Sequence, residues 1–262
     1  MKIGFIGAGN MASALAGGML AAKVVSAENL CLSDMDGEKL AQWIEKGVKT
    51  DSDNLRTAEW ADVLFLAVKP HIIPAVLKEV KGQNCIFVSI AAGVSLSFLE
   101  SGLGSDAKIV RTMPNTPAQV NCGMTIVTPN GNLTQEERVL VRSLLSAVGE
   151  TVELSESYID PATALHGSSP AYVYMFIDAL ADAGVKYGIP KATALKLAAK
   201  AVEGSAKMVL ETGVHPEQLK DNVCSPGGTT IAAVCELEKQ GFRHAVQQAV
   251  VKCVERTREI SQ

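Results

Sequence analysis

The chain has 262 residues, of which 47% are hydrophobic and 20% charged, a composition typical of soluble globular proteins and sufficient for about two domains. Its formal net charge is −4 and it has no run of basic residues, so we do not expect it to bind nucleic acid. The six cysteines and four histidines are scattered, without C-x-x-C pairs or the spacing of metal ligands. This predicts reduced thiols in a cytoplasmic protein and no metal site.

The amino-terminal stretch superficially resembles a targeting segment. Residues 3–22 carry no charge and follow Met1-Lys2, as in a signal peptide. However, five glycines and Asn10 interrupt the continuous apolar run that such a segment requires. We therefore expect neither cleavage nor membrane insertion here, and no other stretch approaches the length of a transmembrane helix.

The same stretch carries a dinucleotide-binding fingerprint. Ile3–Ile6 is a short apolar run typical of a buried parallel strand, and residues 7–12 fit G-x-G-x-x-[G/A] before an apolar helical segment. In this context Gly7 makes the tight turn, Gly9 lets the backbone approach a pyrophosphate, and Ala12 keeps the helix close to the strand. The free N–H groups at the helix N-terminus would face the phosphates. A glycine-rich turn in an ordinary α/β protein is the alternative.

The end of the second predicted strand, 29–33, carries the residues expected at the adenosine ribose. Ser33 and Asp34 stand there, and Asp34 comes 22 residues after Ala12. An acidic residue at this place commonly accepts a hydrogen bond from the ribose 2′-OH and favours NAD, whereas a neutral or basic residue favours NADP. Asp36 is a competing candidate, and either carboxylate could simply lie in the solvated loop before the next helix. The motif therefore leaves the choice between NADP and NAD open.

The alternation of apolar strands and helical segments continues to about residue 155 and predicts a doubly wound, largely parallel sheet of Rossmann type. Two strands end in residues suited to a ligand: Lys69-Pro70 follows one, and the small residues Ala91, Ala92 and Gly93 follow the next. Both exits lie at carboxyl ends, where sheets of this class bind ligands, and small residues leave room for a flat ring. These two strands are expected at 62–68 and 85–90, and further strands are expected at 108–111, 123–129 and 151–154.

The loop after the strand at 108–111 contains two prolines, Pro114 and Pro117, which fix its shape. Asn115 lies between them. Its amide could contact a nicotinamide ring or a substrate, or it could be an ordinary turn residue.

From about residue 156 the strand pattern stops. We expect a dinucleotide-binding domain over 1–155 and an all-α domain for substrate binding and dimerisation over 156–262. A helix over 191–212 carries small residues on several faces, which indicates close helix packing, either within the chain or across a dimer interface.

A possible anion site follows in this helical domain. Ser-Pro-Gly-Gly at 225–228 predicts a tight turn before a helix that begins at Thr229-Thr230. Free N–H groups from Gly227 to Thr230 would converge there on an anion such as a small carboxylate. A capped turn between two helices is the alternative.

These motifs together resemble the pyrroline-5-carboxylate reductases, the last enzymes of proline biosynthesis. The similarity covers nearly the whole chain, and the block D-N-V-C-S-P-G-G-T-T at 221–230 is highly specific for that family. The resemblance implies hydride transfer from NADPH, or from NADH, to the C5 carbon of 1-pyrroline-5-carboxylate, which gives L-proline. It also implies a homodimer, or a ring of dimers, formed through the helical domain. The other blocks that carry the resemblance are 4–11, 67–70, 89–94, 111–117 and 167–172.

The resemblance also implies roles for individual residues. Gly227, Gly228 and Thr229 would hold the substrate carboxylate. Thr230 would be the catalytic residue, near the ring nitrogen, with Asn222 close by. The residues implied at the coenzyme, together with Ser33 and Asp34, are Ile6, Gly7, Ala8, Gly9, Asn10, Met11, Asn54, Ala67, Val68, Lys69, Pro70, Ala91, Ala92 and Gly93.

Two residues depart from the family pattern. His166 stands where members usually carry Ser, before Gly-Ser-[Gly/Ser]-Pro-Ala. Many members also have Ser or Thr in place of Asp34. Those hydroxyls can meet a 2′-phosphate, whereas Asp34 would repel it, so the family's usual preference for NADPH is in doubt for this chain.

Two other functions compete with this interpretation. A β-hydroxyacid dehydrogenase begins with a similar Gly-Phe-Ile-Gly pattern but resembles a family with a lysine on the interdomain helix. The candidate here, Lys186, lies at the wrong end of the helix expected over 171–187. A non-catalytic dinucleotide sensor would keep Gly7 and Gly9 but would not need the anion turn at 225–230.

Overall fold

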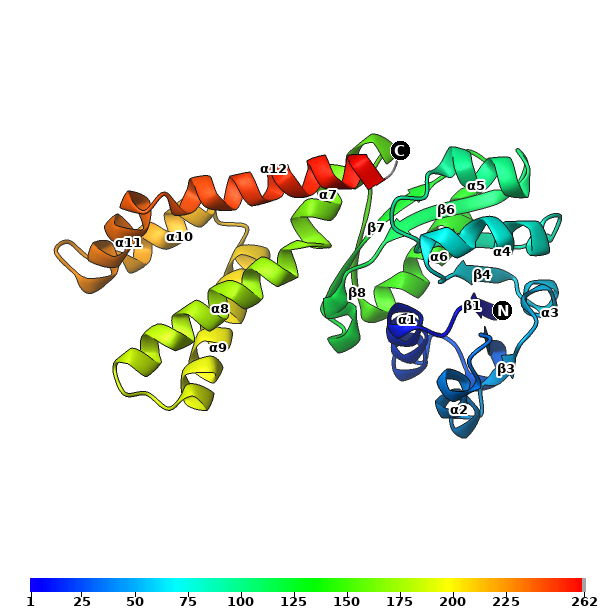
Figure 1. Cartoon of the computed structure of the whole chain (residues 1–262), viewed down its shortest axis with the longest axis horizontal. Helices are drawn as coiled ribbons and strands as arrows, with labels where there is room; N and C mark the ends of the chain where they lie inside the picture. The colour runs from blue at the N-terminus through cyan, green and yellow to red at the C-terminus, as the bar shows by residue number, and fades with distance from the viewer. Residues whose placement is uncertain (261–262) are drawn as a thin grey trace. The chain divides into compact units, whose positions relative to one another are not determined.

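The computed structural model describes residues 1–260 and divides the chain into two compact units (Figure 1). The first unit comprises Met1–Gly167 together with the chain from Val254 on, and the second comprises Ser168–Cys253. The compact units therefore divide after residue 167, and the expected domain boundary at residue 155 stays a prediction.

The first unit is built on a sheet whose strand order is β3-β2-β1-β4-β5-β6-β7-β8 within residues 1–260. All neighbouring strands are parallel except β6 and β7, which are antiparallel. The predicted doubly wound, largely parallel sheet is thus confirmed. The strands are β1 (Ile3–Ile6), β2 (Leu30–Ser33), β3 (Lys49–Asp51), β4 (Val63–Leu66), β5 (Ile86–Ser89), β6 (Lys108–Met113), β7 (Gly123–Pro129) and β8 (Gly149–Glu153).

Helices cover both faces of this sheet (Figure 1). On one face they pack around Phe5 and Phe65, whose rings stack with their centroids 4.4 Å apart. On the other face they pack on Leu64 and Leu66. The central strands are buried on both sides, and for this reason their sequences are almost uninterrupted apolar runs. The first face carries α1 (Asn10–Ala21), α2 (Gly37–Glu45) and α6 (Gln135–Leu145), and the second carries α3 (Asn54–Trp60), α4 (Ile73–Val80) and α5 (Leu96–Leu103).

The order of the strands places the expected ligand crevice. The chain winds from β1 outward through β2 to β3, and then returns to the other side of β1 with β4. The loops after β1 and β4 therefore diverge at the carboxyl edge, which is the point where sheets of this class bind ligands. The unit is completed by α7 (Ile159–His166) and by the 3₁₀ helices η1 (Ala27–Asn29), η2 (Pro70–Ile72), η3 (Thr116–Val120), η4 (Ser146–Val148) and η5 (Glu156–Tyr158).

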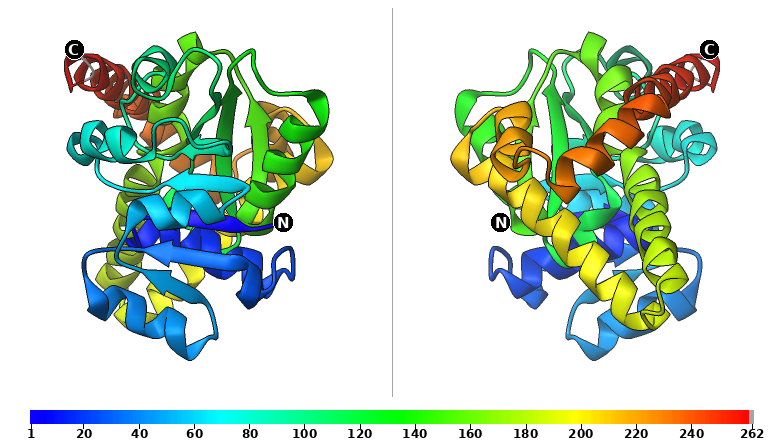
Figure 2. Two further views of the ribbon diagram at one scale, coloured as in Figure 1. Left: turned by 90° about the vertical axis from the view of Figure 1, so that its right-hand side faces the viewer. Right: turned by 90° about the vertical axis from the view of Figure 1, so that its left-hand side faces the viewer.

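The second unit consists of helices, among which α8 (Ser169–Lys186) and α9 (Lys191–Thr212) lie side by side (Figure 2). Small residues allow this approach: a Cβ added to Gly184 of α8 would stand 3.2 Å from the Cβ of Ala194, which is buried on α9. The remaining helices are α10 (Pro216–Val223), α11 (Thr229–Lys239) and α12 (Phe242–Ile260), the last of which ends in residues that belong to the first unit. Among residues 1–260, none of the helices has the length and apolar character needed to cross a membrane.

We expect a thiol reagent such as DTNB to label Cys122 and Cys235 in the native protein, and Cys31 and Cys85 only after unfolding. The first two thiols are exposed and the other two are buried. Burial raises the pKa of both buried thiols, that of Cys85 to about 12, so little of the reactive thiolate forms at neutral pH.

The raised pKa of Cys85 also predicts how stability depends on pH, because only the unfolded chain loses that proton above its ordinary pKa of 9.0. Stability should therefore fall between pH 9 and about 12, and fast labelling of Cys85 in the native state would contradict its burial.

Candidate active site

The first turn of the predicted fingerprint is locked between two strands. Gly7 has φ +99°, its N–H donates to the carbonyl of Ser33 at 2.7 Å, and the N–H of Ala67 donates to the carbonyl of Ile6 at 2.8 Å. A Cβ on Gly7 would stand 2.6 Å from the carbonyl oxygen of Ala67 and 3.1 Å from Val68 Cγ1. The turn after β1 therefore requires glycine, and Ala67 and Val68 form the wall against which it lies.

The second glycine of the fingerprint faces open space. Gly9 is the N-cap of α1 and has no side chain with which to cap the helix. A Cβ added there would find no heavy atom within 4 Å. The first N–H groups of α1 point out of this open surface, as the geometry of a helix N-terminus requires. The arrangement fits the pyrophosphate of a dinucleotide, which needs both close backbone approach and a positive dipole end.

Asp34 contacts the glycine-rich turn directly. Its Oδ2 accepts a hydrogen bond from the N–H of Ala8 at 2.8 Å, and its Oδ1 accepts one from the N–H of Asp36 at 2.9 Å. Lys39 Nζ lies 3.7 Å from the same Oδ1. The carboxylate predicted at the ribose is therefore fixed against the fingerprint, a contact that the spacing of the motif does not reveal.

Ser33 and Asn54 form a second polar contact at this edge. Ser33 is fully buried, and its Oγ donates to Asn54 Oδ1 at 2.8 Å. Asn54 in turn donates from Nδ2 to Glu79 Oε2 at 2.7 Å. The structure thus brings Ser33, Asp34 and Asn54 to the carboxyl ends of β2 and β3, whereas Glu79, which orients the amide, was missed at the sequence level.

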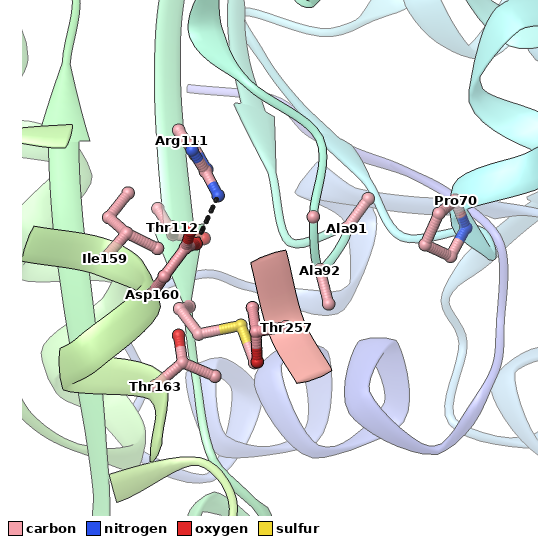
Figure 3. A pocket seen from close by; sticks show the side chains of 11 residues that line it. Pro70, Ala91, Ala92, Arg111, Thr112, Ile159, Asp160, Thr163 and Thr257 are labelled. Carbon is pink, nitrogen blue, oxygen red and sulfur yellow. Dashed lines mark ion pairs between the residues drawn. The ribbon is translucent and has the colours of Figure 1, made fainter. Parts of the chain in front are cut away.

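A cavity of about 200 Å³ lies at the carboxyl ends of β4, β5 and β6 (Figure 3). Pro70, Ala91 and Ala92 line one side of it, and Ile159 and Thr163 of α7 line the other (Figure 3). Gly93 also belongs to the lining. Small apolar residues thus leave a slot of the kind that a flat ring requires. Thr112, Met113 and Thr257 also line the cavity.

Two charged side chains, Arg111 and Asp160, are built into the wall of this cavity. Arg111 of β6 is 7% exposed, and its Nη1 donates to Glu156 Oε1 at 2.7 Å, while Nη2 lies 3.8 Å from Asp160 Oδ1 (Figure 3). Glu156 Oε1 also accepts a hydrogen bond from the N–H of Leu96, at the start of α5, at 2.7 Å. Arg111 therefore ties β6 to η5, α5 and α7. The one sequence signal for it was a charged residue at the end of an apolar strand.

Asn115 has a structural task. Its Nδ2 donates to the carbonyl of His166 at 3.0 Å, and its Oδ1 accepts from the N–H of Met124 at 2.9 Å. With both ends of the amide engaged and the residue 9% exposed, the structure favours neither a coenzyme contact nor a simple turn residue, but a buried clasp between loops.

His166, the departure from the family pattern, connects α7 to the end of β6. Its Nδ1 lies 2.7 Å from the carbonyl of Ala162 and its Nε2 lies 2.8 Å from the carbonyl of Met113. A neutral imidazole donates one hydrogen bond, so it can satisfy one of these carbonyls at a time. The residue thus supports the segment that lines the cavity.

In the second unit the turn before α11 forms as predicted, with one correction. Gly227 has φ +66°, and α11 begins at Thr229 with Gly228 as N-cap. The N–H of Gly228, however, donates to the carbonyl of Ser225 at 3.0 Å. The expectation that all N–H groups from Gly227 to Thr230 are free is therefore wrong at Gly228, because the turn itself uses that group.

The groups that remain for an anion are the N–H of Gly227 and those of the first turn of α11. The N–H groups of Thr229 and Thr230 have no intrahelical acceptor, as at the start of every α-helix. Thr230 is half-buried and Thr229 is exposed. Asn222, at the end of α10, is exposed and accepts a hydrogen bond from Gln218 Nε2 at 2.9 Å. In the part of the chain that the structure describes, no three His, Cys, Asp or Glu side chains are grouped as a metal site requires.

Two family models match the chain. The model for pyrroline-5-carboxylate reductase dimerisation matches residues 156–260, and the model for coenzyme F420-dependent NADP oxidoreductase matches residues 2–93. Among curated proteins, the pyrroline-5-carboxylate reductase of Escherichia coli K12 is 49% identical over 99% of this chain and 98% of its own. Pyrroline-5-carboxylate reductase 2 of Homo sapiens is 45% identical over 99% of this chain and 84% of its own.

Solved structures of pyrroline-5-carboxylate reductases resemble this one over nearly their whole length. A pyrroline-5-carboxylate reductase from Coxiella burnetii superposes with a TM-score of 0.94 at 37% identity, covering 100% of this chain and 98% of that chain. The Plasmodium falciparum enzyme with NADP bound superposes with a TM-score of 0.90 at 35% identity, with the same coverage of 100% and 98%.

Proposed function

The chain belongs to the pyrroline-5-carboxylate reductase family, and from this premise we propose how its residues carry out the reaction. The protein is an NAD(P)H-dependent oxidoreductase that reduces the C=N bond of 1-pyrroline-5-carboxylate to give L-proline, the last step of proline biosynthesis. The observation that carries this function is 49% identity over nearly the full length of both chains. The alternatives of a β-hydroxyacid dehydrogenase and of a non-catalytic sensor are thereby set aside.

The first unit provides the coenzyme site. The enzyme uses NADPH as a coenzyme. The match to the NADP oxidoreductase model and the NADP-bound relative support this use. We assign the pyrophosphate to the open surface at Gly9 and the N-terminus of α1, and the nicotinamide side to the cavity lined by Pro70 and residues 91–93. When bound, the reduced nicotinamide supplies the hydride. The apolar walls of the cavity exclude water and hold the ring in one orientation.

The second unit provides the substrate site. The N–H groups and hydroxyls at the start of α11 hold the carboxylate of the cyclic imine, with Gly227 shaping the turn. The Thr230 hydroxyl oxygen accepts a hydrogen bond from the N–H of the ring in its reactive iminium form. It can donate one to the nitrogen lone pair that hydride addition creates, and the product amine keeps the iminium proton. No strong acid or base is needed, because catalysis consists mainly of holding the imine carbon in line for the hydride.

We expect Thr230→Ala to lower kcat/KM by 10- to 100-fold, on the order of 1.4–2.7 kcal/mol of transition-state stabilisation. The lost hydroxyl is the hydrogen-bond partner of the ring nitrogen, whereas the helix N-terminus that holds the carboxylate remains. Thr230→Ser keeps the hydroxyl and is expected to stay close to the wild-type rate. Steady-state kinetics of the three proteins test this, and an unchanged rate for Thr230→Ala would remove Thr230 from the mechanism.

The function itself is tested by the initial rate of 1-pyrroline-5-carboxylate reduction, followed through the absorbance of the reduced coenzyme. Turnover with NADPH and with NADH should be measured in parallel on the same preparation. Folded protein that binds a coenzyme and turns over no imine would overturn the reductase assignment.

Self-association is supported by the dimerisation model and by the surface of the second unit. Its long helices expose large apolar side chains to an extent that a monomer rarely tolerates, among them Tyr174, Met175, Leu197 and Leu210, each more than half exposed. We propose a homodimer through this unit, with a ring of dimers as its higher assembly.

We also propose a cytoplasmic location, in keeping with six free cysteines, and no nucleic-acid partner, in keeping with the net charge of −4.

A further inference from the structure

The carboxylate of Asp34 is held in one position by groups on three sides. The N–H groups of Ala8 and Asp36 donate to its two oxygens at 2.8 Å and 2.9 Å, and Lys39 Nζ lies 3.7 Å from Oδ1. The side chain is 16% exposed. A carboxylate held in this way cannot swing aside to admit a bulky anion without losing its hydrogen bond to Ala8.

Asp34 lies where a dinucleotide-binding fold places the adenosine ribose. Asp34 directly follows β2, and Ala8 is the middle residue of the Gly7-Ala8-Gly9 turn. In a dinucleotide fold, the group at the end of β2 meets the ribose 2′ position, while the turn meets the pyrophosphate. One carboxylate here touches both parts of the site.

The surrounding charges are unfavourable to a further anion. Two cations near the carboxyl ends of β2 and β3 are each already paired with two carboxylates. Lys39 lies 3.7 Å from Asp34 and 3.3 Å from Asp36. Arg56 lies 3.4 Å from Asp51 and 3.3 Å from Asp53. The two groups adjoin, since the N–H of Asp34 donates to the carbonyl of Asp51 at 3.3 Å. Formally the cluster carries two positive and four negative charges. The four carboxylates are those of Asp34, Asp36, Asp51 and Asp53.

We propose that Asp34 makes this enzyme select NADH over NADPH, so that NADPH is accepted but bound more weakly. The inference rests on the proposed coenzyme site of the first unit. A ribose 2′-OH donates a hydrogen bond to the Asp34 carboxylate. A 2′-phosphate offers no hydrogen to it, repels it, and would have to draw Lys39 away from the carboxylates that it pairs with.

The proposal is tested first by calorimetric titration of the wild-type full chain with NADH and with NADPH, in the absence of substrate. We expect NADH to bind at least about 10-fold more tightly, and the difference to shrink with added salt because the repulsion is screened. Equal affinities, or tighter binding of NADPH, would overturn the proposal. This readout does not depend on turnover.

Asp34→Asn then isolates the charge, because the amide oxygen can still accept from the N–H of Ala8. We expect this variant to bind NADPH about 10-fold more tightly than the wild type does, with a smaller loss for NADH. Asp106→Asn removes the same charge from an exposed loop before β6 and should leave the ratio of NADH affinity to NADPH affinity unchanged. If Asp34→Asn does not alter this ratio either, Asp34 does not determine the selectivity.

The kinetic assay separates this inference from the proposed function. If NADH binds more tightly but no imine is reduced, the reductase assignment fails and the selectivity stands. If imine is reduced with a higher kcat/KM for NADPH than for NADH, the function stands and the selectivity fails. If the folded wild type binds neither coenzyme, both fail.

Discussion

Gly7→Ala will weaken coenzyme binding strongly and destabilise the protein, whereas Gly9→Ala will weaken binding strongly without loss of stability. At Gly7 the backbone has φ +99°, which L side chains rarely adopt, and the new Cβ would stand 2.6 Å from the carbonyl oxygen of Ala67 and 2.9 Å from its carbon. Both are backbone atoms at the end of β4 and cannot rotate away. Strain at the turn and the collision together should cost about 2–4 kcal/mol of unfolding free energy.

Gly9 is the matched control because it belongs to the same motif and has no such constraint. Its φ of −73° suits any residue, and no heavy atom lies within 4 Å of the added Cβ. The unfolding free energy should therefore change by less than about 0.5 kcal/mol. The Cβ would instead occupy the space that we assign to the pyrophosphate, so affinity for NADH and NADPH should fall by about 100-fold or more.

Denaturant unfolding and calorimetric titration of both variants separate the two effects. Loss of stability with Gly7→Ala and preserved stability with Gly9→Ala are expected. Coenzyme binding that survives Gly9→Ala would show that the pyrophosphate does not lie on this loop. A Gly7→Ala protein as stable as the wild type would show that the turn relaxes around the new methyl group.

The sequence predicts the frame of this fold well for a physical reason. The central strands are buried on both faces, so their apolar runs are unmistakable, and Thr134 opens α6 with a complete capping box in which Glu137 returns the hydrogen bond. The edge strand β3 was not predicted. It has three residues, Lys49–Asp51, none of them buried, and an exposed polar edge carries no hydrophobic signal.

The same distinction holds for the candidate site. Residues with a local role can be predicted from the sequence, such as the glycine that a positive φ requires. Contacts between distant segments are not: Asp34 meets Ala8 across 26 residues, and Asn115 meets His166 across 51. At Gly228 the error arose within one turn, because a free N–H group and one that closes the turn look alike in a sequence.

The buried ion pair at the cavity wall leads to the second large prediction: Glu156→Ala should destabilise the protein by about 3 kcal/mol, more than Arg111→Met does. Arg111 is the buried member, with 9% of its side chain exposed against 34% for Glu156. Removing Glu156 leaves a buried guanidinium with Asp160 at 3.8 Å as its remaining partner among those that the structure records. It also removes the acceptor of the Leu96 N–H at the start of α5.

Arg111→Met removes the buried charge itself and leaves an apolar side chain in its place, so its cost should be about 1–2 kcal/mol. The more exposed carboxylate of Glu156 can then return to water. The double variant should therefore be more stable than Glu156→Ala alone, because it no longer buries an unpaired cation. Such non-additivity is what distinguishes a buried charge from a mere packing contact.

The half-exposed pair of Arg138 and Glu153, 3.3 Å apart with side chains 29% and 37% exposed, serves as the control because neither member is buried as Arg111 is. Glu153→Ala should cost less than about 1 kcal/mol, because both groups remain hydrated when they separate. Denaturant unfolding of the four variants gives the comparison. If Glu156→Ala costs no more than Glu153→Ala, the guanidinium of Arg111 reaches water in spite of its burial. In that event it cannot hold β6, η5 and α7 together around the cavity, and the wall of the proposed nicotinamide site must be fixed by its apolar contacts alone.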